Sequence, residues 1–263
     1  MEVFETITCN LARPVASITL NRPAARNAMS NRMVEELYSC FHELAGDAYA
    51  GVRAVVVRAE GNVFCSGGDI GDLSNPLPPE QNWAAIARLD QLLRAVNEAP
   101  QVVITRVQGA ALGGGLGLVC VSDIVIASTS ATFALPEVRL GLVPSVISPY
   151  VVARIGLSRA RMLTLTGAQI GAEAAHAYGL IHEVCADDEL DATLDAVLAN
   201  VLKCAPQALR AGKRLLFKVA TESNENTLAY RVDLLNRLRT GEEAQQGMQA
   251  FMKKRPAPWV IES

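Results

Sequence analysis

The sequence predicts an α/β fold with parallel strand pairing, on two observations. Apolar runs rich in β-branched residues alternate with segments whose apolar residues recur at helical spacing. Two of these runs, within residues 55–70 and 102–117, lead into glycine-rich turns. Glycine reaches backbone angles and close approaches that side chains forbid, so each turn can be tight. The order strand, helix, strand favours parallel strands joined by helical crossovers.

The first 107 residues contain three predicted strands and two predicted helices. Ser30 is of a type that caps helices, and apolar positions recur every three or four residues after it. Three prolines between residues 73 and 82 predict a surface loop before the second helix. The strands are predicted at residues 15–20, 52–58 and 102–107, and the apolar helix faces comprise Met33, Leu37, Phe41 and Leu44, then Ile86, Leu89, Leu93 and Val96.

The remaining chain is predicted to be mostly helical after two further strands at residues 123–128 and 131–135. Pro144 and Pro149 are expected to break the helical pattern, and residues 180–184 form a short late strand. Beyond Asp187 we expect only helices, which cover the core or pack on a partner subunit. Their apolar stripes comprise Leu190, Leu194, Val197, Leu198, Val201 and Leu202; Leu228, Val232, Leu235 and Leu238; and Ala244, Met248, Phe251 and Met252.

Composition excludes several classes of function. At 263 residues and 50% hydrophobic content the chain can bury a large core, and a net charge of -3 gives no electrostatic footprint for nucleic acid. No signal peptide or membrane-spanning run is evident. The six cysteines include no Cys-x-x-Cys pair, which favours free thiols in a reducing cytoplasm. The three histidines lack metal-ligand spacing, so we predict no metal site.

The second glycine turn does not match a nucleotide-binding motif. Residues 113–118 depart from Gly-x-Gly-x-x-Gly because Leu118 stands where the motif requires its last glycine. No P-loop lysine follows either. A serine-hydrolase elbow also fails, since Phe64 stands two residues before Ser66. An apolar, helix-compatible run follows the turn, and the start of such a helix would direct free N–H groups at one point as an oxyanion hole. The alternative is a tight turn where a helix packs on a strand.

Glu137 is the candidate acid or base. It follows Pro136 among apolar neighbours, so it could simply complement the dipole of a helix that begins there. If it lines an apolar pocket instead, desolvation would raise its pKa towards the range useful for proton transfer. Asp69 and Asp123 lie beside strands and turns, where fixing loops is the more ordinary role.

Five segments stand out in order over nearly the whole chain. They are Asn21-Arg22-Pro23-Ala24-Ala25-Arg26-Asn27-Ala28, Phe64-Cys65-Ser66-Gly67-Gly68-Asp69-Ile70, Gly109-Ala110-Ala111-Leu112-Gly113-Gly114-Gly115, Phe133-Ala134-Leu135-Pro136-Glu137 and Phe251-Met252-Lys253-Lys254-Arg255. Together these segments resemble the crotonase family of enoyl-CoA hydratases and isomerases. The resemblance implies a spiral of ββα units in residues 1–200. It also implies a helical C-terminal region, residues 201–263, that forms a homotrimer or a hexamer built as a dimer of trimers.

The resemblance also implies the site. The substrate is an acyl-CoA thioester, and coenzyme A is part of it, so no separate cofactor is expected. The N–H groups of Gly68 and Gly114 hold the thioester oxygen, and Glu137 handles protons. By the same carry-over, the coenzyme A contacts are Ala24, Arg26, Ser66, Asp69 and Ile70, joined by Phe251 and Lys254, which match tail positions that approach the coenzyme A of a neighbouring subunit.

One departure from the family pattern bears on the reaction. Typical hydratases carry a first glutamate at the position of Gly117, and only Glu137 is present here. One carboxylate suffices for a Δ3,Δ2-enoyl-CoA isomerase, whereas two are usually invoked for hydration. Residues 137–151 nevertheless look like bacterial hydratases of branched acyl-CoAs, such as methylglutaconyl-CoA hydratase, and we hypothesise that Arg139 or another cation binds a distal carboxylate.

Hydratase is therefore the first prediction and isomerase the second. An acyl-CoA-binding relative without turnover, or a thioester hydrolase that uses the same oxyanion hole, remain alternatives. RNA binding, known in one branch of the family, is disfavoured by the acidic balance.

Overall fold

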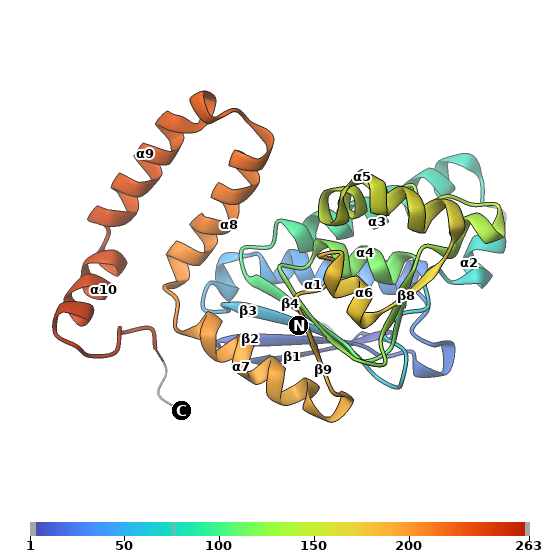
Figure 1. The fold of residues 1–263 in the computed structure, drawn as a ribbon, viewed down its shortest axis with the longest axis horizontal. Helices are drawn as coiled ribbons and strands as arrows, with labels where there is room; N and C mark the ends of the chain where they lie inside the picture. The colour runs from blue at the N-terminus through green and yellow to red at the C-terminus, as the bar shows by residue number, and fades with distance from the viewer. Residues whose placement is uncertain (1–3, 76, 261–263) are drawn as a thin grey trace. The chain divides into compact units, whose positions relative to one another are not determined.

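A computed structural model of the protein describes residues 4–75 and 77–260 (Figure 1). The chain divides into two compact units. Unit 1 comprises Met1–Ala99 and Val103–Leu194, and unit 2 comprises Pro100–Val102 and Asp195–Ser263. Both glycine turns and Glu137 belong to unit 1, which therefore holds the candidate chemistry.

A six-stranded mixed sheet forms the base of unit 1, in the order β1-β2-β3-β4-β6-β9. β1 is antiparallel to β2, whereas β2 with β3, β4 with β6 and β6 with β9 are parallel. Parallel pairing is thus confirmed, although the sequence pattern did not predict β1. The strands span β1 Ile7–Ala12, β2 Val15–Leu20, β3 Ala54–Ala59, β4 Val102–Val107, β6 Ile124–Ser128 and β9 Glu183–Cys185.

Helices cover one face of this sheet, as Figure 1 shows for α1, α3 and α4. α1 packs on α3, α3 on α4, and α4 on α5. The predicted cap is confirmed, since Met33 N donates to Ser30 Oγ at 3.2 Å. The helices of unit 1 are α1 Asn31–Leu44, α2 Ile70–Ser74, α3 Pro79–Asn97, α4 Gly114–Val121, α5 Ser148–Thr166 and α6 Ala172–Ala177.

A second, three-stranded sheet brings the two later site segments together. Its order is β5 (Ala110–Leu112), β7 (Thr132–Ala134) and β8 (Gln169–Gly171). β5 and β7 are parallel, so their C-terminal ends lie at the same edge. The second glycine turn follows β5, and the 3₁₀ helix η3 (Pro136–Leu140) follows β7 after one residue. This pairing is what places Glu137 beside the glycines.

Two local predictions were wrong, and a third was too wide. The surface loop predicted at 73–82 is shorter, since α2 ends at Ser74 and α3 already begins at Pro79, which is tolerated at the first helical position; residue 76 lies outside the described residues. Ile86 is 47% exposed, and Leu92 takes its place in the core. Pro149 does not break a helix but lies in the first turn of α5.

Unit 2 consists mainly of helices. α8 (Pro206–Thr221), which the apolar stripes did not predict, packs on α9 (Asn224–Thr240), and α9 packs on α10 (Glu242–Met252). α7 (Leu190–Leu202) leads into this unit. Leu228 and Leu235 of the predicted second stripe are more than half exposed. No helix in the described part of the chain is both long and apolar enough to cross a membrane.

Candidate functional site

The two glycine turns lie side by side. Cys65 of the first turn bridges to β5, since its N–H donates to Ala110 O at 3.0 Å and its carbonyl accepts from Leu112 N at 2.9 Å. The glycines that follow also meet: a Cβ built on Gly113 would lie 3.5 Å from the Cα of Gly67. Two segments about 45 residues apart in sequence thus form one local surface.

The main chain on either side of Gly68 is held by Met29. Met29 N donates to Gly67 O at 2.8 Å, and Asp69 N donates to Met29 O at 3.1 Å. These bonds use the groups that flank Gly68 and leave out its own N–H. Among the described residues, no backbone carbonyl accepts a hydrogen bond from Gly68 N. Gly68 therefore keeps a free main-chain donor beside the second turn.

Gly114 begins α4, so its N–H has no partner within the helix. The first intrahelical bond of this turn runs from Gly117 N to Gly113 O at 3.0 Å. The helix start also packs directly on the first turn, because a Cβ at Gly115 would lie 2.6 Å from the Cβ of Cys65 and 2.9 Å from its carbonyl oxygen. Only glycine fits there, and the positive end of the helix dipole adds to the donors.

Glu137 lies against this turn. A Cβ on Gly113 would be 3.0 Å from Glu137 Oε1, and Glu137 Oε2 is buried without a hydrogen-bond partner among the described residues. Burial raises the pKa of the carboxyl, and the main-chain N–H of Glu137 itself partly opposes that shift. A buried oxygen without a partner calls for an explanation, and contact with a bound molecule supplies one.

The helical turn beyond Gly113 presents an apolar wall instead of a second carboxylate. A Cβ at Gly117 would lie 2.5 Å from Ile147 Cγ2 and 3.6 Å from Leu93 Cδ2. Ile147 is 2% exposed and is the N-cap residue of α5. Sequence reasoning missed Ile147, because nothing in its local pattern connects it to residue 117.

Three residues assigned to coenzyme A come together next to the first turn. Ala24 and Arg26 are exposed around a short 3₁₀ helix, and Ser66 N donates to Arg26 O at 3.1 Å. Arg26 has a positive φ of 51°. The fully buried Asn27 anchors this segment, since its Nδ2 donates to Glu60 O at 2.9 Å.

Asp69 and Ile70 adjoin the same turn with different environments. Asp69 caps α2 by accepting from Gly71 N at 2.9 Å, and it pairs with Arg22 at 2.9 Å. The Arg22 guanidinium lowers the pKa of Asp69. Arg22 also donates to Ala28 O at 2.6 Å. Asp69 therefore fixes the loop, the ordinary role that the sequence left open, while the Ile70 side chain is 58% exposed.

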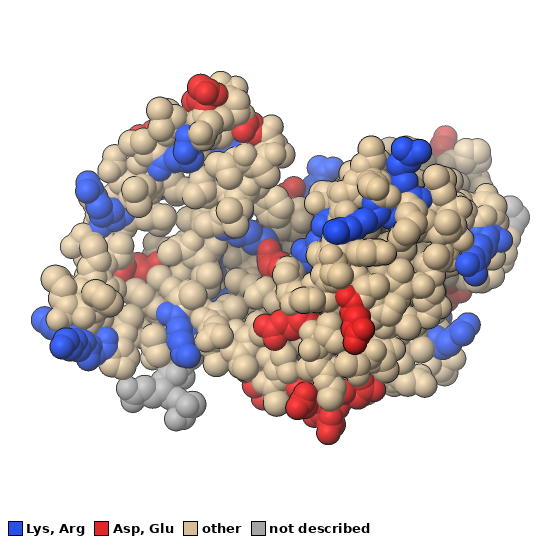
Figure 2. Space-filling view, viewed as in Figure 1, with Lys and Arg blue, Asp and Glu red and all other residues tan. Residues whose placement is uncertain are grey.

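The two remaining candidates, Phe251 and Lys254, belong to unit 2. Phe251 lies near the end of α10 and is 85% exposed, and Lys254 follows the helix with a positive φ of 51°. The surface in Figure 2 shows lysine and arginine side chains interspersed with acidic ones and with wide uncharged areas.

The cysteines offer no nucleophile at the turns. Cys65 is fully buried, and burial raises the pKa of its thiol to about 11, so the thiol stays protonated at neutral pH. Within the described residues, no group of three His, Cys, Asp or Glu side chains is arranged to hold a metal ion.

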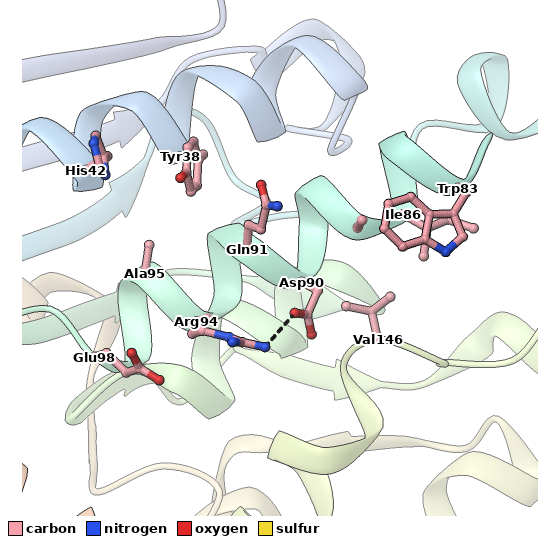
Figure 3. Close-up of a pocket in the computed structure, with 11 residues that line it drawn as sticks. Tyr38, His42, Trp83, Ile86, Asp90, Gln91, Arg94, Ala95, Glu98 and Val146 are labelled. Atoms are coloured by element: carbon pink, nitrogen blue, oxygen red, sulfur yellow. Dashed lines mark hydrogen bonds and ion pairs between the residues drawn. The ribbon is translucent and has the colours of Figure 1, made fainter. Parts of the chain in front are cut away.

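A surface groove of about 610 Å³ lies elsewhere, over the outer face of α3 (Figure 3). Asp90 and Arg94 form an ion pair of 3.2 Å in it, and both side chains are exposed. Glu137 and the glycine turns do not line this groove. Its lining residues are Tyr38, His42, Trp83, Ile86, Ala87, Asp90, Gln91, Arg94, Ala95, Glu98 and Val146.

Comparisons with known proteins find similarity over nearly the whole chain. Residues 11–261 match a family model described as enoyl-CoA hydratase/isomerase. A protein of Rhodobacter capsulatus named probable enoyl-CoA hydratase is 32% identical, over 96% of this chain and 97% of its own. The 1,2-epoxyphenylacetyl-CoA isomerase of Escherichia coli is also 32% identical, with 96% and 97% covered. The solved structure of Pseudomonas aeruginosa AtuE is 39% identical with a TM-score of 0.94, and 98% and 100% are covered.

Proposed function

The chain belongs to the enoyl-CoA hydratase/isomerase family, and from that premise we propose that it adds water across the 2,3 double bond of an acyl-CoA thioester. The observation that carries the proposal is the position of Glu137. Its buried, unpartnered Oε2 belongs to a carboxyl that lies against Gly113, at the turn where α4 begins with Gly114. A base and two donors next to each other are the parts that enolate chemistry needs.

The N–H groups of Gly68 and Gly114 would receive the thioester oxygen. When water adds at carbon 3, negative charge moves to that oxygen, and fixed main-chain donors stabilise it without reorganising. Removing one such donor costs about 3 kcal/mol of transition-state stabilisation in enzymes where this has been measured. The helix dipole of α4 acts in the same direction.

Glu137 would carry out both proton transfers, from water and to carbon 2. Its carboxylate takes a proton from water as the water oxygen bonds to carbon 3, and the pair of electrons of the double bond moves into the enolate. Glu137 then returns the proton to carbon 2, which restores the thioester and the carboxylate. Burial makes the carboxylate a stronger base than a solvated glutamate, since its pKa is raised.

The test is a panel of 2-enoyl and 3-enoyl CoA thioesters incubated with the protein, without added metal or cofactor, and analysed by mass spectrometry. Hydration adds the mass of one water to the thioester, and the Glu137→Gln variant should not form this hydrated product. Release of free coenzyme A would identify a thioester hydrolase instead. Binding without any product would identify an acyl-CoA-binding protein, and either result would reject the hydratase.

Isomerisation is the second candidate, and it is favoured by the apolar side chain of Ile147 beside Gly117, where a typical hydratase has its first glutamate. A proton shuttle between carbon 2 and carbon 4 needs one carboxylate and no bound water, and the space beside Gly117 is filled by the apolar side chains of Ile147 and Leu93. The relative from Escherichia coli is itself named an isomerase. A 3-enoyl thioester converted to its 2-enoyl isomer, with no gain of mass, would decide for this reaction.

For the acyl group we propose a chain branched at carbon 3 that ends in a carboxylate, as the resemblance of residues 137–151 suggests. Arg139 is exposed and lies along Gly167, the C-cap of α5, where a Cβ would be 2.8 Å from its Nε. Substitution of Arg139 tests whether its guanidinium binds the distal carboxylate. Arg139→Ala should raise the KM for methylglutaconyl-CoA and leave the KM for crotonyl-CoA unchanged. If wild type and Arg139→Ala have equal KM values for methylglutaconyl-CoA, Arg139 does not bind the distal carboxylate.

We also propose that the protein forms a homotrimer or a hexamer. Large apolar side chains are exposed on the helices of unit 2, and association would remove them from water. Light scattering coupled to size exclusion should give three or six times 28.1 kDa, whereas a monomer at micromolar concentration would reject the proposal. The exposed side chains include Leu216, Phe217, Leu228, Leu235 and Phe251.

A further inference from the structure

Gly117 and Ile147 share one volume. A Cβ at residue 117 would lie 2.5 Å from Ile147 Cγ2 and 3.3 Å from Ile147 Cβ. Real Cβ atoms essentially never approach a neighbour to 2.5 Å, so the two positions cannot both carry a large side chain. Ile147 fills the space in which the side chain of residue 117 would otherwise stand.

This volume is adjacent to the proposed reacting atoms. Gly117 N donates to Gly113 O, so the two residues are one helical turn apart on α4. Glu137 Oε1 lies over Gly113, and Gly114 supplies a proposed donor to the thioester oxygen. The β-carbon is two bonds of about 1.5 Å from the thioester carbon, and one helical turn is about 5.4 Å. With the thioester oxygen held at Gly114, a substituent on the β-carbon would extend toward the turn that carries Gly117.

We propose that Ile147 is a specificity-determining residue, whose side chain packs against the substituent on the β-carbon of the bound acyl group. The inference rests on the proposed function for the location of the thioester. Leu93, which is fully buried and lies 3.6 Å from the same position, completes the apolar wall. An apolar wall at this point favours a methyl branch over a charged group.

The position of Ile147 is fixed by packing and by hydrogen bonds of the main chain around it, so its side chain can distinguish acyl groups by their substituent on the β-carbon. Ile147 is 2% exposed and begins α5, with Tyr150 N and Val151 N donating to its carbonyl at 3.1 Å. Ser148 N is bound in turn to Pro144 O at 3.0 Å. Because the main chain around Ile147 is hydrogen-bonded and its side chain is packed, removing side-chain atoms leaves space rather than a collapsed wall.

The test compares the binding of two unreactive thioesters, butyryl-CoA and 3-methylbutyryl-CoA, by titration calorimetry. Wild-type protein should bind the branched thioester more tightly, and Ile147→Ala should reduce that preference about tenfold, the scale on which one methylene is recognised. Ile147→Val, a smaller deletion, should give an intermediate preference. If Ile147→Ala does not fold, the binding preference of Ile147→Val alone tests the inference.

Ile18→Ala is the matched control, because Ile18 is equally buried but lies in β2 of the large sheet. It should lose stability and keep the preference. A preference that Ile147→Ala and Ile147→Val leave unchanged would overturn the inference even if the enzyme hydrates enoyl thioesters. A shifted preference without turnover would uphold it while the proposed reaction fails, and no binding of either thioester to wild type would reject both.

Discussion

The guanidinium of Arg22 lies 2.9 Å from the carboxylate of Asp69 and ties the segment before α1 to the turn that carries Gly68. Arg22 Nη1, which makes this contact, also donates to Ala28 O at 2.6 Å. Both side chains are partly exposed, at 27% and 20%, so the pair contributes at most about 1 kcal/mol to stability. Its importance is positional, because Asp69 N and Gly67 O are the groups that hold the main chain on either side of Gly68.

Arg22→Met keeps the length of the side chain and removes its charge and donors. We expect kcat/KM to fall about tenfold or more, since small displacements of catalytic donors are costly, while the thermal midpoint changes little. Steady-state kinetics and calorimetry measure the two effects. Arg94→Met is the control, because it breaks the exposed Arg94–Asp90 pair on the outer face of α3. Equal kcat/KM values for the two variants would show that the Arg22 pair does not position Gly68.

Glu137→Gln retains the shape of the side chain and removes its basicity. We expect kcat to fall by about 10²–10⁴, the usual contribution of a positioned acid or base, with coenzyme A thioester binding largely kept. Glu98→Gln, in the groove over α3, provides a control of the same chemistry away from the glycine turns. A Glu137→Gln variant with more than half of the wild-type kcat would exclude Glu137 from proton transfer.

Glu137 also predicts a pH dependence of stability. Its pKa is raised in the folded protein by burial, so the protonated form is favoured there relative to the unfolded chain. Its contribution to the free energy of unfolding is therefore complete below about pH 4.3, the ordinary glutamate pKa, and is lost as the pH rises through the folded-state pKa. The slope reaches at most about 1.4 kcal/mol per pH unit.

Denaturant unfolding of wild type and Glu137→Gln across this range measures the effect. The difference between the two free energies should fall with rising pH and then level off. Asp69 and Glu36 have lowered pKa values and act with the opposite sign, but both variants contain them, so the subtraction removes their effect. A difference that stays constant or rises with pH would contradict a raised pKa for Glu137.

Local patterns predicted the parts of the fold that depend on nearest neighbours. The strand at 15–20 and the Ser30 cap are examples, because both follow from residues within a few positions of each other. α8 was missed, although the predicted stripes found the helices on either side of it. Ile86 was placed in the core on spacing alone, and only the packing of α3 shows that Leu92 is there instead.

The same distinction between local patterns and long-range contacts applies to the residues of the candidate site. Glu137 stood out in the sequence because a carboxylate followed a proline among apolar residues. The Arg22–Asp69 pair joins residues 47 positions apart, and the contact between Gly117 and Ile147 spans 30. Neither has a local signal, since each depends on how strands pair and on where a turn meets a helix. Sequence reasoning therefore found the absence of a side chain at residue 117 but not the residue that fills its place.

The contact between Gly117 and Ile147 gives the last prediction, on stability. Gly117→Ala adds a methyl group 2.5 Å from Ile147 Cγ2, and overpacking of this kind typically costs about 1–3 kcal/mol. Ile147→Ala alone should also destabilise, by about 2–5 kcal/mol, because it leaves a cavity. In the double variant the new methyl group enters that cavity, so its free energy of unfolding should exceed the value expected from adding the two losses. Denaturant unfolding of the four proteins gives this coupling; a coupling below about 0.5 kcal/mol would mean that the two side chains do not compete for one volume.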